Sequence, residues 1–312
     1  MQSAMTLTIL GSSSALPTSE RYPSAHVLKA HERLFLIDCG EGTQMQFRRN
    51  RIRFGRLNHI FISHLHGDHV FGLYGLLSTF SLMGRKSGLH LYAPENYMSI
   101  LTSHLSDFDI KLGFDIDFVP LSGDDPVEIL NDKYITVFSF PLKHRIPAFG
   151  FLFREKEAPR NIIKEKIKEY NIPVVRIPSI KNGEDFVLPT GRVISNSELT
   201  TDPPEPLSYA YCSDTRYFSR LSSFVKGVTV LYHEATFDKD KQDLAEKTGH
   251  STTVDAARTA LSAGAGSLII GHFSARYRDV SPLVEETREV FPRSFAAVDG
   301  KSYDIHDYAE PK

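Results

Sequence analysis

The sequence of this 312-residue chain has little of what marks secreted or membrane-spanning proteins. Its only two cysteines, Cys39 and Cys212, lie far apart and form no Cys-x-x-Cys pair. This excludes a disulfide framework or a disulfide-linked partner and indicates a reducing compartment. No apolar run approaches the ~20 residues of a membrane-spanning helix, and residues 1–10 lack the basic and apolar segments of a secretory signal. We therefore expect a cytoplasmic protein without membrane contact.

The sequence also lacks an excess of charge of either sign. It has 36 Lys and Arg against 38 Asp and Glu, which gives a formal net charge of −2. A nucleic-acid partner would therefore have to meet a local basic patch, because the chain as a whole has no positive field. The composition is otherwise that of a globular protein, with 41% hydrophobic residues, and the length allows one large domain with an ample core.

Three histidines and an aspartate are crowded into six residues directly after an apolar run: His64, His66, Asp68 and His69. Side chains two apart on an extended chain point to the same side, so His64 and His66 can converge on one ion. A glycine then lets the chain turn, so that Asp68 and His69 face a second point nearby. Such ligands suit zinc, iron or manganese, and the apolar spacing over residues 70–80 predicts a packed helix that holds them. An accidental surface cluster is the alternative.

Further strand-like segments each end in a carboxylate or a histidine. These residues are Asp38, His144, Asp214, Glu234 and His272. Taken alone, each is as readily a turn or structural residue as a functional one. His250 precedes an alanine-rich helix, for which Thr252 and Asp255 stand at capping-box spacing.

The His-x-His-x-Asp-His run resembles the metallo-β-lactamase superfamily, whose members have an α/β (α+β) fold, an αββα sandwich with a di-metal site at the sheet edge. Within that superfamily, five segments are similar to the ribonuclease Z family: Leu36–Gln44, Phe61–Leu77, His233–Phe237, His250–Thr253 and His272–Tyr277. The resemblance runs from about Leu7 to Val298. It implies a metal-dependent endoribonuclease that removes the 3′ trailer from precursor tRNA, leaving a 3′-hydroxyl on the tRNA and a 5′-phosphate on the trailer.

The resemblance also implies two Zn²⁺ ions per subunit, with manganese or iron left open. The implied metal ligands are His64, His66 and His144 for one ion, Asp68, His69 and His272 for the other, and Asp214 as the bridge. Asp38 would brace a ligand from behind. Asp68 would also orient the attacking water and accept its proton. His250 would protonate the leaving oxygen while Glu234 holds its ring, and the alternative for this pair is a capping histidine and a buried carboxylate.

Residues 154–191 differ from the rest of the predicted single domain, 1–312, and are expected to form an inserted flexible arm. Between residues 154 and 181 there are eight Lys or Arg against four Asp or Glu. A short helix is predicted over 161–170, with Asn161 as a possible cap. The resemblance implies an exosite here, with Lys164, Lys166 and Lys168 contacting precursor tRNA, and a homodimer; a solvated loop is the alternative.

Substrate contacts nearer the site are predicted at Ser274 and Arg276, where a phosphate or a surface salt bridge would engage the arginine. The loop 17–22 reads Pro-Thr-Ser-Glu-Arg-Tyr, whereas the family has Pro-x-Lys-x-Arg-Asn. How CCA-bearing tRNA is discriminated is therefore left open. Two other functions stay open as well: a small-molecule metallo-hydrolase acting on phosphodiesters, aryl sulfates or lactones, and a nucleic-acid-binding relative without catalysis, which would require a missing ligand.

Overall fold

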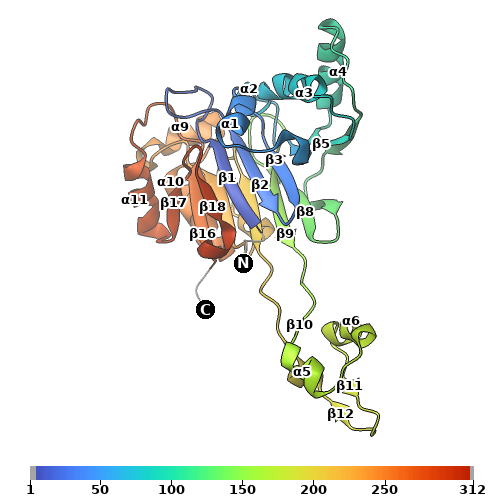
Figure 1. Ribbon diagram of the computed structural model, residues 1–312. Helices are drawn as coiled ribbons and strands as arrows, with labels where there is room; N and C mark the ends of the chain where they lie inside the picture. Colours follow the sequence, from blue (N-terminus) through green and yellow to red (C-terminus); the bar gives the residue numbers. More distant parts are fainter. Residues whose placement is uncertain (1–4, 310–312) are drawn as a thin grey trace. The chain divides into compact units, whose positions relative to one another are not determined.

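The structure is a computed structural model that describes residues 5–309. The chain divides into two compact units. Within the described residues, one consists of residues 5–154 and 207–309, and the other is Glu155–Pro206. The larger unit contains two seven-stranded sheets, each of them mixed (Figure 1).

The first large sheet has the strand order β18-β1-β2-β3-β4-β5-β6. Antiparallel pairs join β18, β1, β2 and β3, whereas β3, β4, β5 and β6 run parallel. Its strands are β1 (Met5–Gly11), β2 (Ala25–Ala30), β3 (Arg33–Ile37), β4 (Leu57–Phe61), β5 (Leu89–Pro94), β6 (Ile116–Leu121) and β18 (Ser302–Asp304).

The second large sheet has the strand order β17-β16-β15-β14-β9-β8-β7. The strands β14, β15, β16 and β17 run parallel, and β9 is antiparallel to β14. Its strands are β7 (Val127–Asn131), β8 (Ile135–Leu142), β9 (Ala148–Glu155), β14 (Ser208–Cys212), β15 (Val230–Glu234), β16 (Ser267–Gly271) and β17 (Ser294–Ala296). The strands β7, β9 and β17 were not predicted from the sequence.

The layers of this unit form because successive side chains on a strand pack on opposite faces of its sheet. On β3, Phe35 and Ile37 pack between the two sheets, while Leu36 points to the opposite face and packs under helices. This period of two is what a strand buried on both faces requires. Figure 1 shows α10 and α11 beside β16 and β17, on the outer face of the second sheet. The predicted αββα sandwich is thereby confirmed.

The helices of this unit are short or of moderate length, and none within residues 5–309 is long and apolar enough to cross a membrane. They are α1 (Thr43–Arg49), α2 (Gly67–Val70), α3 (Gly72–Leu82), α4 (Tyr97–Asp107), α8 (Leu221–Phe224), α9 (Gln242–Thr248), α10 (Thr253–Ala263) and α11 (Ser281–Val290). The predicted capping box is confirmed, because the backbone N–H groups and side chains of Thr252 and Asp255 bond reciprocally. Cys39 and Cys212 are free and buried.

The unit Glu155–Pro206 has a small core of its own, built around Ile180, Phe186 and Leu199. Its elements are β10 (Asn161–Ile162), α5 (Lys164–Glu169), α6 (Ile177–Lys181), β11 (Phe186–Val187), β12 (Val193–Ile194), α7 (Asn196–Leu199) and β13 (Thr200–Thr201). The unit extends beyond the predicted end at residue 191. Asn161 does not cap a helix, because it pairs with Thr201 in a two-stranded sheet.

The excess of positive charge in this unit is confined to its first part. Over the whole of Glu155–Pro206 there are eight Lys or Arg and nine Asp or Glu. The basic character predicted over 154–181 is therefore balanced by acidic residues nearer the end of the unit. Any binding of a polyanion here must depend on which face the lysines occupy, since the unit as a whole carries no positive excess.

Candidate metal centre and active site

The polar residues predicted at strand ends meet because the strands that carry them are parallel. In the first sheet, Asp38 follows β3 directly, and the histidine run follows β4. In the second sheet, Asp214 comes after β14, Glu234 is the last residue of β15, and His272 follows β16. The carboxyl ends of parallel strands lie at one edge of a sheet, which is where α/β proteins place their ligands.

Three of these residues have backbone conformations that L-amino acids rarely adopt. The φ angles of Asp38, Asp214 and His272 are 57°, 55° and 57°, in the left-handed region. Such conformations cost free energy at residues other than glycine and concentrate at functional sites. Each turns the chain just after a strand, so that the side chain is held at the sheet edge.

A first group of possible metal ligands is formed by His64, His66, His144 and Asp214, whose ligand atoms all lie within 4.8 Å of one another. The Nδ1 atom of His66 is 3.0 Å from Nε2 of His64 and 3.2 Å from Nε2 of His144. Asp214 Oδ2 lies 3.4 Å from the same nitrogen of His64 and 3.8 Å from that of His144. Several imidazole nitrogens directed at one point are the arrangement that a transition-metal cation requires.

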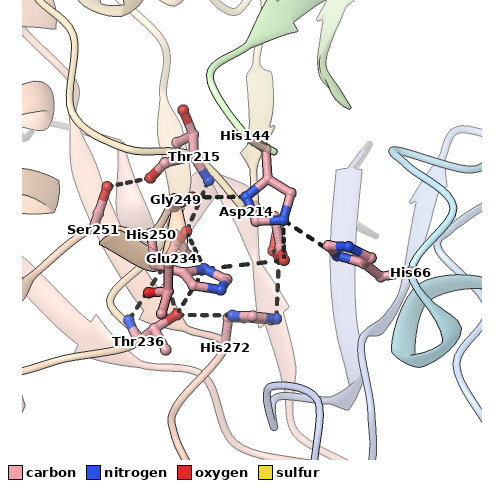
Figure 2. A network of polar contacts seen from close by, with 12 residues as sticks. His66, His144, Asp214, Thr215, Glu234, Thr236, Gly249, His250, Ser251 and His272 are labelled. Atoms are coloured by element: carbon pink, nitrogen blue, oxygen red, sulfur yellow. Dashed lines mark hydrogen bonds and ion pairs between the residues drawn. The ribbon is translucent and has the colours of Figure 1, made fainter. Parts of the chain in front are cut away.

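A second group consists of Asp68, His69 and His272. Asp68 Oδ2 is 3.4 Å from Nε2 of both histidines. Asp214 Oδ1 lies 3.2 Å from Nε2 of His69 and 3.1 Å from Nε2 of His272. Asp214 thus turns one oxygen to each group; Figure 2 shows His144 and His272 both directed towards it.

The outward nitrogens of these rings are fixed by hydrogen bonds. His69 Nδ1–H donates to Asp38 Oδ2 at 2.7 Å, and His144 Nδ1–H donates to the carbonyl oxygen of Gly249 at 2.7 Å. The hydroxyl of Thr236 donates to Glu234, so its oxygen accepts from His272 Nδ1–H at 2.9 Å. When these rings are neutral, each inward nitrogen is left with its lone pair free, as a metal ligand needs.

Burial and neighbouring carboxylates set the protonation of the site. Burial lowers the pKa of His64 and lowers that of His144 to about 4, which favours neutral rings. Burial would also lower the pKa of His69, but the surrounding carboxylates, chiefly Asp214, raise it well above its usual value. Burial acts to raise the pKa of Asp214, yet the neighbouring histidines hold it well below its usual value. Buried carboxylates that remain ionised favour positive charge between them.

His250 and Glu234 form a pair beside these ligands. His250 Nδ1 is 2.9 Å from Glu234 Oε1, and the same oxygen accepts the backbone N–H of Thr215 at 2.8 Å. Glu234 is fully buried, whereas His250 is partly exposed to the cavity. Burial acts to lower the pKa of His250, but the Glu234 carboxylate raises it to about 9. The structure therefore brings these two predicted residues into direct contact with each other.

A cavity of about 600 Å³ opens over the two groups. Its lining includes metal-site residues, the polar Ser14, Arg145 and Ser274, and the apolar Pro17, Phe71 and Phe237. Arg276 is exposed beside this rim, where its Nε donates to Ser274 Oγ at 3.1 Å and its guanidinium lies 5.1 Å from the ring centre of Phe237. Its contacts there are a hydroxyl and a ring, rather than the acid of a salt bridge.

The three predicted lysines lie on α5, in the unit Glu155–Pro206. Lys166 Nζ is 2.8 Å from Glu169 and 3.6 Å from Glu198, so its charge is neutralised. Lys164 and Lys168 are exposed and stand four residues apart, which puts them on one face of the helix. Lys166 falls on another side because helical periodicity separates neighbours two apart.

Sequence reasoning missed several residues that orient the candidate ligands. Thr236 joins Glu234 to His272, and it lies inside the His-Glu-Ala-Thr segment that was singled out for other reasons. Ser63 and Tyr211 both contact Asp38, and the carbonyl of Gly249 fixes His144. Tyr211 lies in the strand that leads to Asp214, but no local pattern could show the partner of its hydroxyl on the other sheet.

Comparison with known proteins places this geometry in a family. A family profile described as "Anti-Pycsar protein Apyc1" matches residues 5–108. Ribonuclease Z of Bacteroides thetaiotaomicron is 45% identical over 306 residues, covering 98% of this chain and 97% of that protein. The crystal structure of the short form of human tRNase Z superimposes with a TM-score of 0.71 at 26% identity, covering 96% of this chain and 99% of that one.

The fold itself is shared more widely. The metallo-beta-lactamase fold protein YhfI from Bacillus subtilis matches with a TM-score of 0.68 at 17% identity, over 96% of this chain and 98% of that one. This second structure bears on the fold alone, whereas the near full-length identity to ribonuclease Z bears on the family. The chain belongs to the ribonuclease Z family, phosphodiester hydrolases of the metallo-β-lactamase superfamily.

Proposed function

We propose that this chain is a metal-dependent endoribonuclease that removes the 3′ trailer from precursor tRNA. The observation that carries the proposal is Asp214, whose two oxygens face two separate groups of ligands at the floor of a cavity. Two cations a short distance apart are suited to in-line displacement at phosphorus. Membership of the ribonuclease Z family indicates that the substrate is precursor tRNA.

The residues present fit two cations. His64, His66 and His144 would hold one, Asp68, His69 and His272 the other, and Asp214 both. This mixture of imidazole and carboxylate suits Zn²⁺, and also Mn²⁺ or iron. When bound, such a pair ionises water more readily and stabilises negative charge on the attacking and leaving oxygens. Asp38 would support this set through its hydrogen bond to His69.

The chain's own side chains would handle the protons of the reaction. Water attacks the phosphorus, and the bond to the 3′ oxygen of the tRNA breaks, which leaves a 3′-hydroxyl on the tRNA and a 5′-phosphate on the trailer. Asp68 lines the cavity as an ionised carboxylate, so it can orient the water and accept its proton. His250, kept protonated by Glu234, would donate a proton to the departing 3′ oxygen.

Substrate contacts complete the proposal. Ser274 and Arg276 stand at the rim of the cavity, where a hydroxyl and a guanidinium can bind a phosphate. Lys164 and Lys168, exposed on one face of α5, would contact the RNA backbone, with Lys166 contributing less because it is paired. A homodimer and a cytoplasmic location remain part of the proposal; sedimentation of the purified chain with and without precursor tRNA tests the first.

The experiment is cleavage of a labelled precursor tRNA, with and without CCA, beside bis-nitrophenyl phosphate, with metal analysis of the same preparation. We expect a single cut that leaves a 3′-hydroxyl, and loss of that cut when the metal is removed. Cleavage of the small phosphodiester without any cleavage of the precursor would favour a small-molecule metallo-hydrolase instead. The comparison of the two precursors would show whether loop 17–22 still discriminates CCA.

A further inference from the structure

One buried phenol connects the two large sheets beneath the candidate metal centre. Tyr211 lies on β14 of the second sheet, and its hydroxyl donates to Oδ2 of Asp38, which follows β3 of the first sheet, at 2.6 Å. Both side chains are fully buried. We infer that Tyr211 is a positioning residue that fixes Asp38, and through it one ligand of each metal group. The inference rests on the proposed function, because it concerns the same cations.

The Asp38 carboxylate is held by four hydrogen bonds. Its Oδ2 accepts from Tyr211 at 2.6 Å, from His69 Nδ1–H at 2.7 Å and from Ser63 Oγ at 2.8 Å. Its Oδ1 accepts the backbone N–H of Ser63 at 2.7 Å. Of these four donors only Tyr211 comes from the second sheet. Through this hydroxyl the second sheet contacts the carboxylate that lies behind His69.

Ser63 extends the effect of Asp38 to the other metal group. Because the Ser63 hydroxyl donates its proton to Asp38, its oxygen is free to accept from His64 Nδ1–H, 3.0 Å away. His64 belongs to the first group of ligands and His69 to the second. A single carboxylate thus orients a ring in each group, directly for His69 and through Ser63 for His64.

The hydroxyl of Tyr211 is more than a packing feature. Burial and the neighbouring Asp38 raise the pKa of Tyr211 well above its usual value, so the phenol stays protonated and can only donate to the carboxylate. Removing that donor leaves a buried carboxylate oxygen with one partner fewer, and such groups move to recover their hydrogen bonds. The ring itself would remain, stacked on Tyr232 with 5.1 Å between ring centres.

The chain offers a matched control two residues earlier. Tyr209 lies on the same strand, faces the same layer and is equally buried. Its hydroxyl bonds to His26 Nδ1 at 2.9 Å and does not touch Asp38. Tyr209→Phe and Tyr211→Phe each delete one buried hydroxyl from the same strand, so a general loss of stability affects both alike. Only Tyr211→Phe disturbs the metal ligands.

The test measures metal affinity in the full-length protein loaded with Zn²⁺. A chromogenic chelator competes for the ions bound by four proteins: the parent, Tyr209→Phe, Tyr211→Phe and Ser63→Ala. Thermal unfolding of each protein is measured in parallel. We expect Tyr211→Phe to weaken zinc retention by about tenfold, the lower end for partners behind a ligand, chiefly at the ion held by His69, which Asp38 contacts directly. Tyr209→Phe should match the parent. Ser63→Ala should weaken the retention of both ions.

Two results would overturn the inference in distinguishable ways. Equal zinc affinity in Tyr211→Phe and Tyr209→Phe, with the parent retaining two ions, would mean that the Asp38 contact has no positioning role. A parent that retains no Zn²⁺ would remove the proposed metal centre and this inference with it. If Tyr211→Phe did not fold, Ser63→Ala would decide. Unaltered retention of the ion near His64 in that variant would contradict the proposed effect of Asp38 on His64 through Ser63.

Discussion

Glu234→Gln should move the pH range in which the enzyme is active. His250 Nδ1 donates to Glu234 Oε1 at 2.9 Å, and this carboxylate opposes burial and raises the pKa of His250 to about 9. Glutamine keeps the shape of the side chain and its carbonyl acceptor but removes the charge. Asp214 and Asp68 still oppose burial in this variant, so the pKa of His250 should fall from about 9 towards its ordinary 6.5.

The size of the effect follows from these two values. Moving the pKa from about 9 to 6.5 represents about 3 kcal/mol at about 1.4 kcal/mol per pH unit. At pH 8 the protonated fraction of His250 would fall by up to about thirtyfold, and a reaction that needs this proton would slow accordingly. The raised pKa also contributes to folding stability, fully below pH 6.5, and that contribution is lost as the pH rises through about 9.

The assay is the pH dependence of single-turnover cleavage of precursor tRNA by the parent and the variant, at equal metal occupancy. Bound divalent cations lower the pKa of a nearby imidazole in both proteins, so the difference between them is the quantity to measure. Glu246→Gln, an exposed acid on α9, is the control for simple loss of charge. An alkaline limb at the same pH in Glu234→Gln and the parent would refute the role of His250 as proton donor.

Three further predictions test the metal site and the RNA contacts. Asp214→Ala should lose both metal ions and all cleavage, since its two oxygens serve both groups; full activity would end the metal account. Lys164→Ala with Lys168→Ala should weaken precursor tRNA binding in a filter assay, and Lys166→Ala much less, because Lys166 is paired with acids; equal effects would contradict this. Binding should fall as salt rises, by a slope of about 0.9 per phosphate neutralised on a duplex, and no salt dependence would exclude backbone contacts.

Much of the fold was predictable because many of the strands have a recognisable pattern of apolar residues. Alternating apolar residues define β1, and continuous apolar runs followed by a polar residue define β3 and β16. The strand β7 was missed because its burial is slight, as an edge strand's often is, so it carries no apolar alternation. The helix predicted from Asn161 began later, because tertiary pairing with Thr201 overrode local preference.

The candidate site likewise contains residues that the sequence could predict and residues that it could not. The ligand-type residues His64–His69, Asp214 and His272 could be predicted because each follows a strand in a recognisable segment. The residues behind them could not, since the Tyr211 hydroxyl meets Asp38 across 173 positions of sequence and no local pattern carries that pairing. The neutralisation of Lys166 by Glu198 likewise depends on how its unit folds.

The most direct measurement of the central claim is anomalous X-ray scattering from crystals of the metal-loaded chain. The account predicts two metal peaks, one among His64, His66 and His144 and one among Asp68, His69 and His272, with Asp214 contacting both. A single peak, or none at these side chains, would contradict it.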